Sequence, residues 1–144
     1  SEMCIRDSIL GDLLACLAAT KEQIETALTA DSPLETHDDL EPKLKERYKQ
    51  ELSAAIEAEY RRQRSELVAL LQWFLRDIWL QSLQAGQNLL QFPDLATNTA
   101  AIADRIKAEK ALENITIADS LQRQLNTNVQ EALAIEVALL KMAL

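Results

Sequence analysis

The sequence predicts an all-α protein, a helical bundle of about five helices that begins with a long N-terminal helical hairpin. Only two glycines and three prolines occur among the 144 residues, which leaves little material for turns. The composition is rich in alanine, leucine, glutamate and glutamine, which favour helices. Apolar residues recur at helical spacing in every periodic segment, and no segment alternates as a β-strand does. A chain of this length can bury a hydrophobic core of its own.

The most apolar stretch, residues 60–83, is expected to form the central helix of the bundle. Its apolar side chains recur at helical spacing and cover most of the helix circumference: Leu67, Val68, Leu70, Leu71, Trp73, Phe74, Leu75, Ile78 and Trp79. A helix with apolar side chains on nearly all sides must be covered by several neighbours. We therefore expect both Trp73 and Phe74 to lie in the core.

The hairpin is predicted from an amphipathic pattern over residues 9–30 and a long helical pattern over residues 43–85. An acidic loop joins the two helices, with Asp38 or Asp39 as the expected N-cap of the second. Gly86 is the expected stop signal of that second helix.

Three shorter helices are expected after an apolar connector. Asp94 is placed to cap the first of them, which should run to Lys107. The next helix should end near Asn126, and Val129 should begin the last one.

The first residues suggest an artificial origin. Residues 1–7, SEMCIRD, equal the translation of a transposon-end sequencing adapter, and position 1 is not Met. We hypothesise that residues 1–8 are a library scar fused to a truncated reading frame, the alternative being that they are natural. Residues 9–56 would then be an acidic helical hairpin, and residues 57–144 a second helical part, continuous with the hairpin in one domain. Resequencing the locus tests this hypothesis, because native codons continuing upstream through the stretch would refute it.

The net charge of −8 is unevenly distributed, because residues 1–42 hold ten acidic and two basic residues, and the remainder holds thirteen of each. Binding to nucleic acid depends on Lys and Arg that neutralise phosphates, so we expect no direct nucleic-acid binding. Arg61, Arg62 and Arg64 form the one concentrated basic patch. They are a candidate phosphate or partner contact, although a solvated face paired with nearby acids is the better interpretation.

Metal binding and disulfides are not expected. His37 lies among acidic residues in a proline-bounded loop, where such residues are usually solvated or cap helices. One histidine and two cysteines cannot supply the four N and S ligands of a structural zinc site. Cys16 follows Leu13 and Leu14 in the helical pattern, so we expect it to be buried. This cysteine usage suits a reducing cytoplasm.

A membrane span over the central apolar stretch is the competing interpretation of its composition. Gln72, Arg76 and Asp77 interrupt the stretch well before the ~20 apolar residues that a bilayer requires. We therefore expect no membrane association.

No catalytic motif is present. The sequence has no GxxxxGK[ST] phosphate loop, no glycine-framed serine, no HExxH and no Cys/His pair. We expect a non-catalytic chain without a cofactor, because the acidic residues carry no second signal that would point to general acid–base chemistry.

Two segments resemble the C-terminal domain of the delta-prime subunit of the bacterial DNA polymerase III clamp loader. The first is residues 57–80, EAEYRRQRSELVALLQWFLRDIWL, a Leu-rich run that ends in Trp-Phe-Leu-Arg-Asp and a short apolar tail. The second is residues 121–140, LQRQLNTNVQEALAIEVALL, which resembles the family's closing helix, Asn-Val corner and Leu-Ala-x-Glu helix. The residues that carry this second match are Leu125, Asn128, Val129, Leu133, Ala134 and Glu136.

The resemblance covers roughly residues 50–144 and includes FPDLA, residues 92–96, which looks like the family's Pro-Asp-Leu connector. Gln130 and Glu131 depart from the pattern, because Asn-Pro is expected after the Asn-Val corner. The hairpin of residues 9–56 is not part of the usual pattern and looks like a lineage variant.

The resemblance implies a collar, the ring formed by the helical C-terminal domains of five clamp-loader subunits. This chain would be an oligomerisation domain whose partners are the other clamp-loader subunits, and it would help to assemble the pentamer that loads the sliding clamp in DNA replication. Gamma/tau and delta subunits carry related collar domains and stay open as alternatives. A free-standing helical adaptor, with the acidic hairpin as its binding element, is the alternative from another functional class.

The last helix is expected to contact a neighbouring subunit, because it carries two apolar stripes. Leu133, Val137, Leu140 and Leu144 form one stripe, and Ile135, Ala138, Leu139 and Met142 form the other. A surface helix of a monomer needs only one apolar stripe, so we expect the second to meet a neighbour. The expected interface residues are Leu133, Ile135, Leu139 and Met142. Central burial of the helix within its own domain is the alternative.

Overall fold

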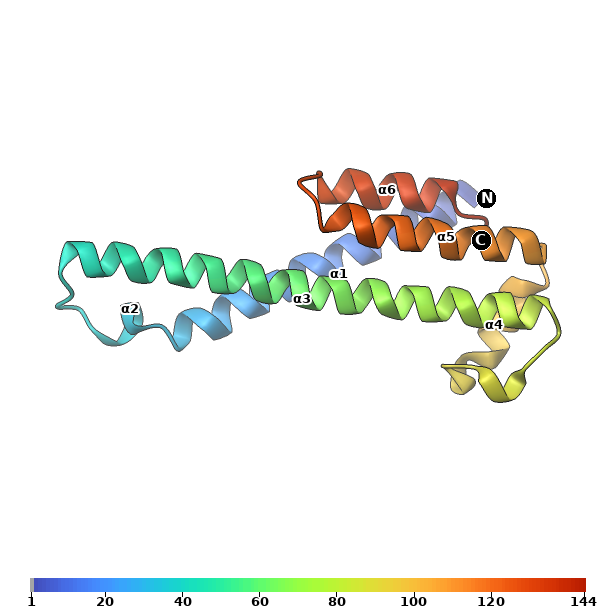
Figure 1. The fold of residues 1–144 in the computed structure, drawn as a ribbon, viewed down its shortest axis with the longest axis horizontal. Coiled ribbons are helices and arrows are strands. Elements are labelled where there is room, and N and C mark those ends of the chain that lie inside the picture. Colours follow the sequence, from blue (N-terminus) through green and yellow to red (C-terminus); the bar gives the residue numbers. More distant parts are fainter. Residues whose placement is uncertain (1) are drawn as a thin grey trace. The chain divides into compact units, whose positions relative to one another are not determined.

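The computed structural model describes residues 2–144, apart from the side chains of residues 2, 3 and 5. Six α-helices and two short 3-10 helices make up this range, which contains no β-strand (Figure 1). The α-helices are α1 (Glu2–Ala30), α2 (Pro33–Thr36), α3 (Pro42–Ser82), α4 (Ala96–Ala103), α5 (Ala108–Leu125) and α6 (Glu131–Lys141); the 3-10 helices are η1 (Gln87–Leu89) and η2 (Pro93–Leu95). The predicted all-α fold is confirmed.

The chain divides into two compact units. Unit 1 combines the chain up to Gly11 with Glu66–Leu144, and unit 2 is Asp12–Ser65. This division differs from the one expected at residue 57, because the second unit includes the arginine-rich turns of α3. It also places the start of α1, where a scar was hypothesised, in the same unit as α5 and α6.

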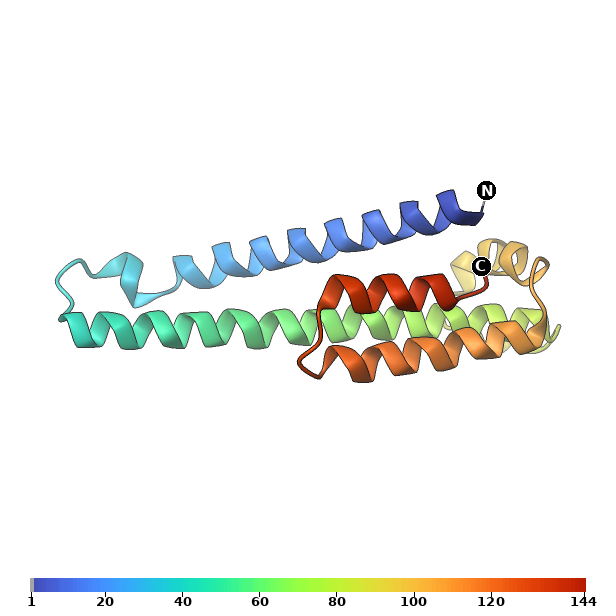
Figure 2. The same cartoon turned by 90° about the horizontal axis from the view of Figure 1, so that it is seen from above.

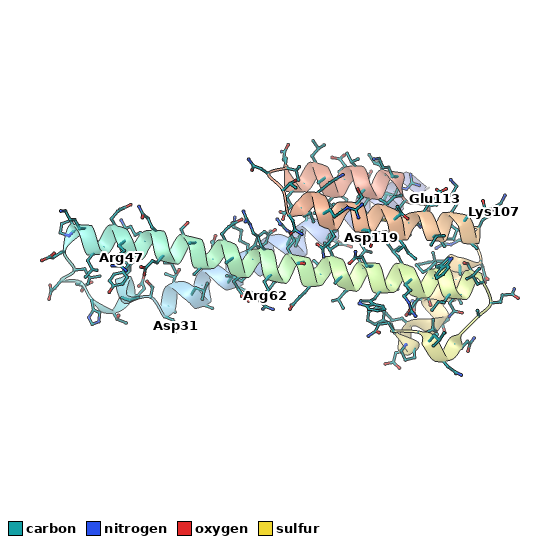
Figure 3. The ribbon with its side chains drawn as sticks, in the orientation of Figure 1. Asp31, Arg47, Arg62, Lys107, Glu113 and Asp119 are labelled. Carbon is teal, nitrogen blue, oxygen red and sulfur yellow. The ribbon has the colours of Figure 1, made fainter. Side chains whose placement is uncertain are left out.

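Unit 1 is built on the second half of α3, with α5 and α6 as an antiparallel pair that lies side by side in both views (Figures 1 and 2). Buried apolar side chains come from all three helices: Val68, Leu75, Ile78 and Leu80 from α3, Ala111, Ala118, Leu121 and Leu125 from α5, and Ile135, Ala138 and Leu139 from α6, followed by Met142. Buried alanines at spacing i, i+7 give α5 a flat face that neighbouring helices can approach closely. Asp119 of α5, labelled in Figure 3, also accepts a hydrogen bond of 2.8 Å from Gln72 Nε2 of α3.

The core face of α3 differs from the expected one. Leu75 and Ile78 are buried as predicted, but Leu70 is exposed and Trp73 is 45% exposed, so placing Trp73 in the core was wrong. The reason is that neighbours cover α3 on only part of its circumference. The ring of Trp73 instead lies beneath the guanidinium of Arg76, whose Cζ is 5.4 Å from the ring centroid. Phe74 is half-buried.

The end of α3 also differs from the prediction. The helix ends at Ser82, before Gly86, and Gln84 adopts the left-handed conformation with φ of 54°. Ala85 N donates to Leu80 O at 3.2 Å, which satisfies a carbonyl of the last turn as in a Schellman ending. Gly86 is left-handed too, with φ of 67°, and it precedes η1.

The connector after α3 is held by a buried carboxylate. The two oxygens of Asp77 accept hydrogen bonds from Gln91 N at 2.9 Å and Phe92 N at 2.8 Å. Arg76 supports the same connector, because its Nη1 donates to Leu89 O at 3.0 Å. Asp77 is completely buried, so this polar residue of the apolar helix anchors a loop.

Unit 2 is an antiparallel helical hairpin of α1 and α3, with α2 in the connection between them (Figure 1). Leu17 and Ile24 of α1 and Tyr60 of α3 are buried. Lys21 Nζ and Arg64 Cζ each lie 5.6 Å from the centroid of the Tyr60 ring, so one aromatic ring contacts a cation from each helix. The Lys21 contact joins the two helices where few large apolar side chains are buried, whereas the Arg64 contact lies within α3.

Two local predictions were wrong in unit 2. Cys16 is exposed, because the buried line of α1 passes through Leu17 and Ile24, about 100° further round the helix. Asp38 and Asp39 lie in a turn before α3. The first carbonyl acceptor of this helix is Glu41 O, which accepts a hydrogen bond from Lys45 N at 2.9 Å, so the helix begins after the predicted N-cap positions.

Helix α4 ends at Ala103 rather than at residue 107, and its N-cap is Leu95, without a side-chain capping bond. Asp94 lies inside η2 instead. Helix α6 begins at Glu131, two residues after the predicted start.

Candidate functional site

The surface of α6 carries a continuous apolar stripe. Leu133, Val137 and Leu140 are 53%, 39% and 55% exposed, and their spacing of i, i+4 and i+7 puts them on one line. The other side of the same helix is buried through Ile135, Ala138 and Leu139. Three large apolar side chains in a row on a surface helix make this line a candidate protein-binding surface. We call Leu133, Val137 and Leu140 the α6 stripe.

The structure corrects the predicted interface residues. Ile135 and Met142 are 1% exposed and Leu139 is 3% exposed, so this chain buries them in its own core. Of the four expected residues, only Leu133 lies on the surface. Both stripes of α6 are apolar, and packing against the alanine face of α5 selects the stripe that turns inward.

A shallow pocket borders the α6 stripe. It has a volume of about 140 Å³ and lies between α5 and α6, with Thr116, Ser120, Gln124, Val137 and Lys141 among its lining residues. Val137 belongs to both the stripe and the pocket. Hydroxyl, amide and ammonium groups at the rim of an apolar surface can orient a bound partner segment.

The arginine cluster of α3 is paired within its own helix. Arg61 Nε lies 3.1 Å from Glu57 Oε1, and Arg62, labelled in Figure 3, binds both oxygens of Glu59 at 2.6 and 3.0 Å. Arg64 is buried and lies over the Tyr60 ring. These contacts of the cluster therefore lie within α3, and its charges are largely committed to partners in the same chain.

Glu59 has a pKa lowered to about 2, first because Arg62 hydrogen-bonds its carboxylate and second because Gln63 Nε2 donates to it at 2.9 Å. A carboxyl group with a depressed folded pKa stabilises the fold above its unfolded pKa, and this contribution is lost as the pH falls through the folded pKa. The stabilising effect of Glu59 should thus be complete above about pH 4.5 and disappear towards pH 2.

Replacing Glu59 by glutamine should make urea-induced unfolding less sensitive to pH between pH 4.5 and 2. The same change at the exposed Glu46 of α3 is the control and should leave the pH dependence unchanged. NMR titration of the Glu59 carboxyl carbon measures the pKa directly, and a midpoint near 4.5 would contradict the assignment.

The described residues contain neither a metal-binding cluster nor a membrane-spanning helix. No three His, Cys, Asp or Glu side chains lie close enough there to hold a metal ion. His37 follows α2, and its backbone N–H donates to Pro33 O at 3.1 Å. None of the helices in residues 2–144 combines the length and apolarity needed to cross a bilayer.

Sequence reasoning missed one buried polar site. Asn114 of α5 is 1% exposed, and its side chain binds the backbone of Ala143. The sequence did contain a signal for this site, namely an asparagine flanked by apolar residues on an amphipathic helix. Such a residue needs a hydrogen-bond partner when it is buried.

Comparison of the chain with protein-family models, with curated proteins and with solved structures gave no match.

Proposed function

We propose that this chain is the collar domain of a clamp-loader subunit of DNA polymerase III, of the delta-prime type. It would help to assemble the pentamer that loads the sliding clamp during DNA replication. The proposal is supported by the resemblance of residues 57–80 and 121–140 to the delta-prime C-terminal domain. Gamma/tau and delta collars share the general architecture and are the nearest alternatives.

The observation that carries the proposal is the α6 stripe. An oligomerisation domain must expose an apolar surface in its isolated form, and Leu133, Val137 and Leu140 provide one on the helix that carries the closing Leu-Ala-x-Glu pattern. Full burial of an exposed side chain of this size contributes ~1.5–3 kcal/mol, and these three side chains, which are 39–55% exposed, can contribute about half of that each before the costs of association. The stripe therefore suits contact with another subunit.

The resembling segments mostly come together in unit 1. The Pro-Asp-Leu connector is η2, and the Asn-Val corner lies between α5 and α6. Residues 66–80 of the first segment belong to the same unit. Most residues that resemble the family thus belong to one compact unit, which supports a common origin for the arrangement.

We infer a non-catalytic, cytoplasmic role for the domain, with the other clamp-loader subunits as partners. The intrahelical pairing of Arg61 and Arg62 argues against a nucleic-acid contact through the arginine cluster, because phosphate binding would compete with existing carboxylate partners. The sequence lacks the catalytic motifs named above, which agrees with a role in assembly.

The proposed interface is tested by changing Leu133 and Leu140 together to glutamate. Both side chains are exposed, so the double variant should retain its helical spectrum. The amount of the other clamp-loader subunits that co-purifies with it should fall at least about tenfold, since a loss of ~1.4 kcal/mol in binding free energy corresponds to a factor of ten. The matched control is Leu89→Glu, an exposed leucine of the same unit outside the stripe.

A folded double variant that assembles as well as the wild type would refute the α6 stripe as the interface. Failure of the wild-type chain itself to assemble with clamp-loader subunits would instead favour the helical adaptor.

A further inference from the structure

The segment that follows α6 is bound like a peptide. Helix α6 ends at Lys141, and Met142 continues in extended conformation with φ of −75° and ψ of 142°. The side chain of Met142 is buried, and Ala143 and Leu144 are half-buried. The segment 142–144 thus leaves the helix at an extended Met142 and lies in contact with the unit.

Two side chains distant in sequence bind three successive main-chain groups of this segment. Asn114 Nδ2 donates to Ala143 O at 2.6 Å, and Ala143 N donates to Asn114 Oδ1 at 2.9 Å. Arg6 Nη2 donates to Met142 O at 2.9 Å. All of these residues belong to unit 1.

This arrangement exceeds what is needed to end a helix. The cap of α6 is already made locally by Met142 N, which donates to Leu139 O at 3.3 Å. The amide of Asn114 uses one of its N–H donors and its carbonyl oxygen, and these match the carbonyl and N–H of a single residue, Ala143. Main-chain bonds of this kind provide affinity in peptide recognition, and the buried neighbouring side chain provides specificity.

We propose that Asn114, with the site that buries Met142, is a binding site for an extended peptide, and that residues 142–144 of this chain are its exchangeable occupant. The ligand class is a peptide with methionine, or a similar flexible apolar residue, followed by a residue that has a main-chain N–H. This site is separate from the α6 stripe, and the proposal does not depend on the clamp-loader assignment.

The variant Ala143→Pro should release the segment from the site. Proline has no N–H to donate to Asn114 Oδ1. It also favours an extended residue before it, which Met142 already is, so α6 should be undisturbed. Acetyl-Met-Ala-Leu-amide should bind this full-length variant at least about tenfold more tightly than the wild type, whose own segment competes at high effective concentration. Dissociation constants can be measured by NMR titration.

The matched control peptide is acetyl-Met-Pro-Leu-amide, which lacks the N–H read by Asn114 and should bind at least about tenfold more weakly. Equal binding of both peptides, or no binding of either to a folded Ala143→Pro chain, would overturn the proposal. Equal affinity of the alanine peptide for the variant and the wild type would overturn it as well.

Limited trypsin cleavage after Lys141 tests the same site in the wild-type chain. Excess acetyl-Met-Ala-Leu-amide should displace the segment and raise the rate of loss of residues 142–144 at least about threefold, as measured by intact mass, because cleavage requires a released strand. The proline peptide should have no effect. Asn114→Leu should raise this rate without added peptide, whereas Asn126→Leu, at an exposed position after α5, should not. An unchanged rate with the alanine peptide would contradict an exchangeable occupant.

Discussion

Replacing Leu75 by alanine should lower the free energy of unfolding of unit 1 by about 2 to 5 kcal/mol. Leu75 is 1% exposed and is among the largest fully buried side chains of the described residues. Its truncation removes apolar contacts and leaves a cavity, because α3 is held by neighbours and cannot collapse to fill the space. A loss of this size is a large part of the stability of an ordinary domain.

Leu70→Ala is the matched control for this experiment. It removes the same atoms from the same helix, but Leu70 is 52% exposed, so the expected change is below about 1 kcal/mol. Both tryptophans of the chain, Trp73 and Trp79, belong to unit 1, and their fluorescence during urea unfolding therefore reports on this unit. Equal effects at Leu75 and Leu70 would contradict the assigned core face of α3.

Replacing Asp77 by alanine should destabilise unit 1 by about 2 to 5 kcal/mol, because two main-chain N–H groups lose a buried acceptor and each costs ~1–3 kcal/mol. The effect should be concentrated at the connector. Amide hydrogen exchange at Gln91 and Phe92 should accelerate more than exchange in α5, and NMR can measure both.

The control for Asp77 is Asp94→Ala, which removes an exposed carboxylate of η2. It should change stability by less than about 0.5 kcal/mol. Unchanged exchange at Gln91 and Phe92 in the Asp77 variant would show that the connector does not depend on this carboxylate.

Leu75 and Asp77, the residues changed in these two experiments, are buried on the same helix for different reasons. Leu75 follows the rule that apolar side chains are buried, and periodicity alone suffices to place it near the core. Asp77 does not follow this rule. In the sequence, its charge served mainly as evidence against a membrane span. Its role depends on the connector, which places the N–H groups of Gln91 and Phe92 within hydrogen-bond distance of its carboxylate.

The two apolar stripes of α6 also show which features periodicity can predict and which it cannot. Heptad-like spacing predicted two apolar stripes on the last helix, and both are present. The choice of Ile135, Leu139 and Met142 as the outward stripe was wrong, since these residues are buried and the α6 stripe is exposed. Periodicity measures only the angle between two stripes, so it contains no information about which of them faces α5.

The helical class, the long α3 helix, the break after Leu125 and the pairing of the arginine cluster with nearby acids could all be predicted from the sequence. These features depend on interactions within a few residues, namely propensity, proline and asparagine breaks, and i, i+4 contacts. Three further features depend on tertiary packing: the buried faces of α3 and α6, the role of Asp77, and the binding of Ala143 by Asn114. The bonds of Asp77 and Asn114 join residues 14 to 29 positions apart, and the contact of α3 with α5 through Gln72 and Asp119 joins residues 47 positions apart. The free energy that selects these features comes from burial and from satisfying buried polar groups across elements, which no local pattern encodes.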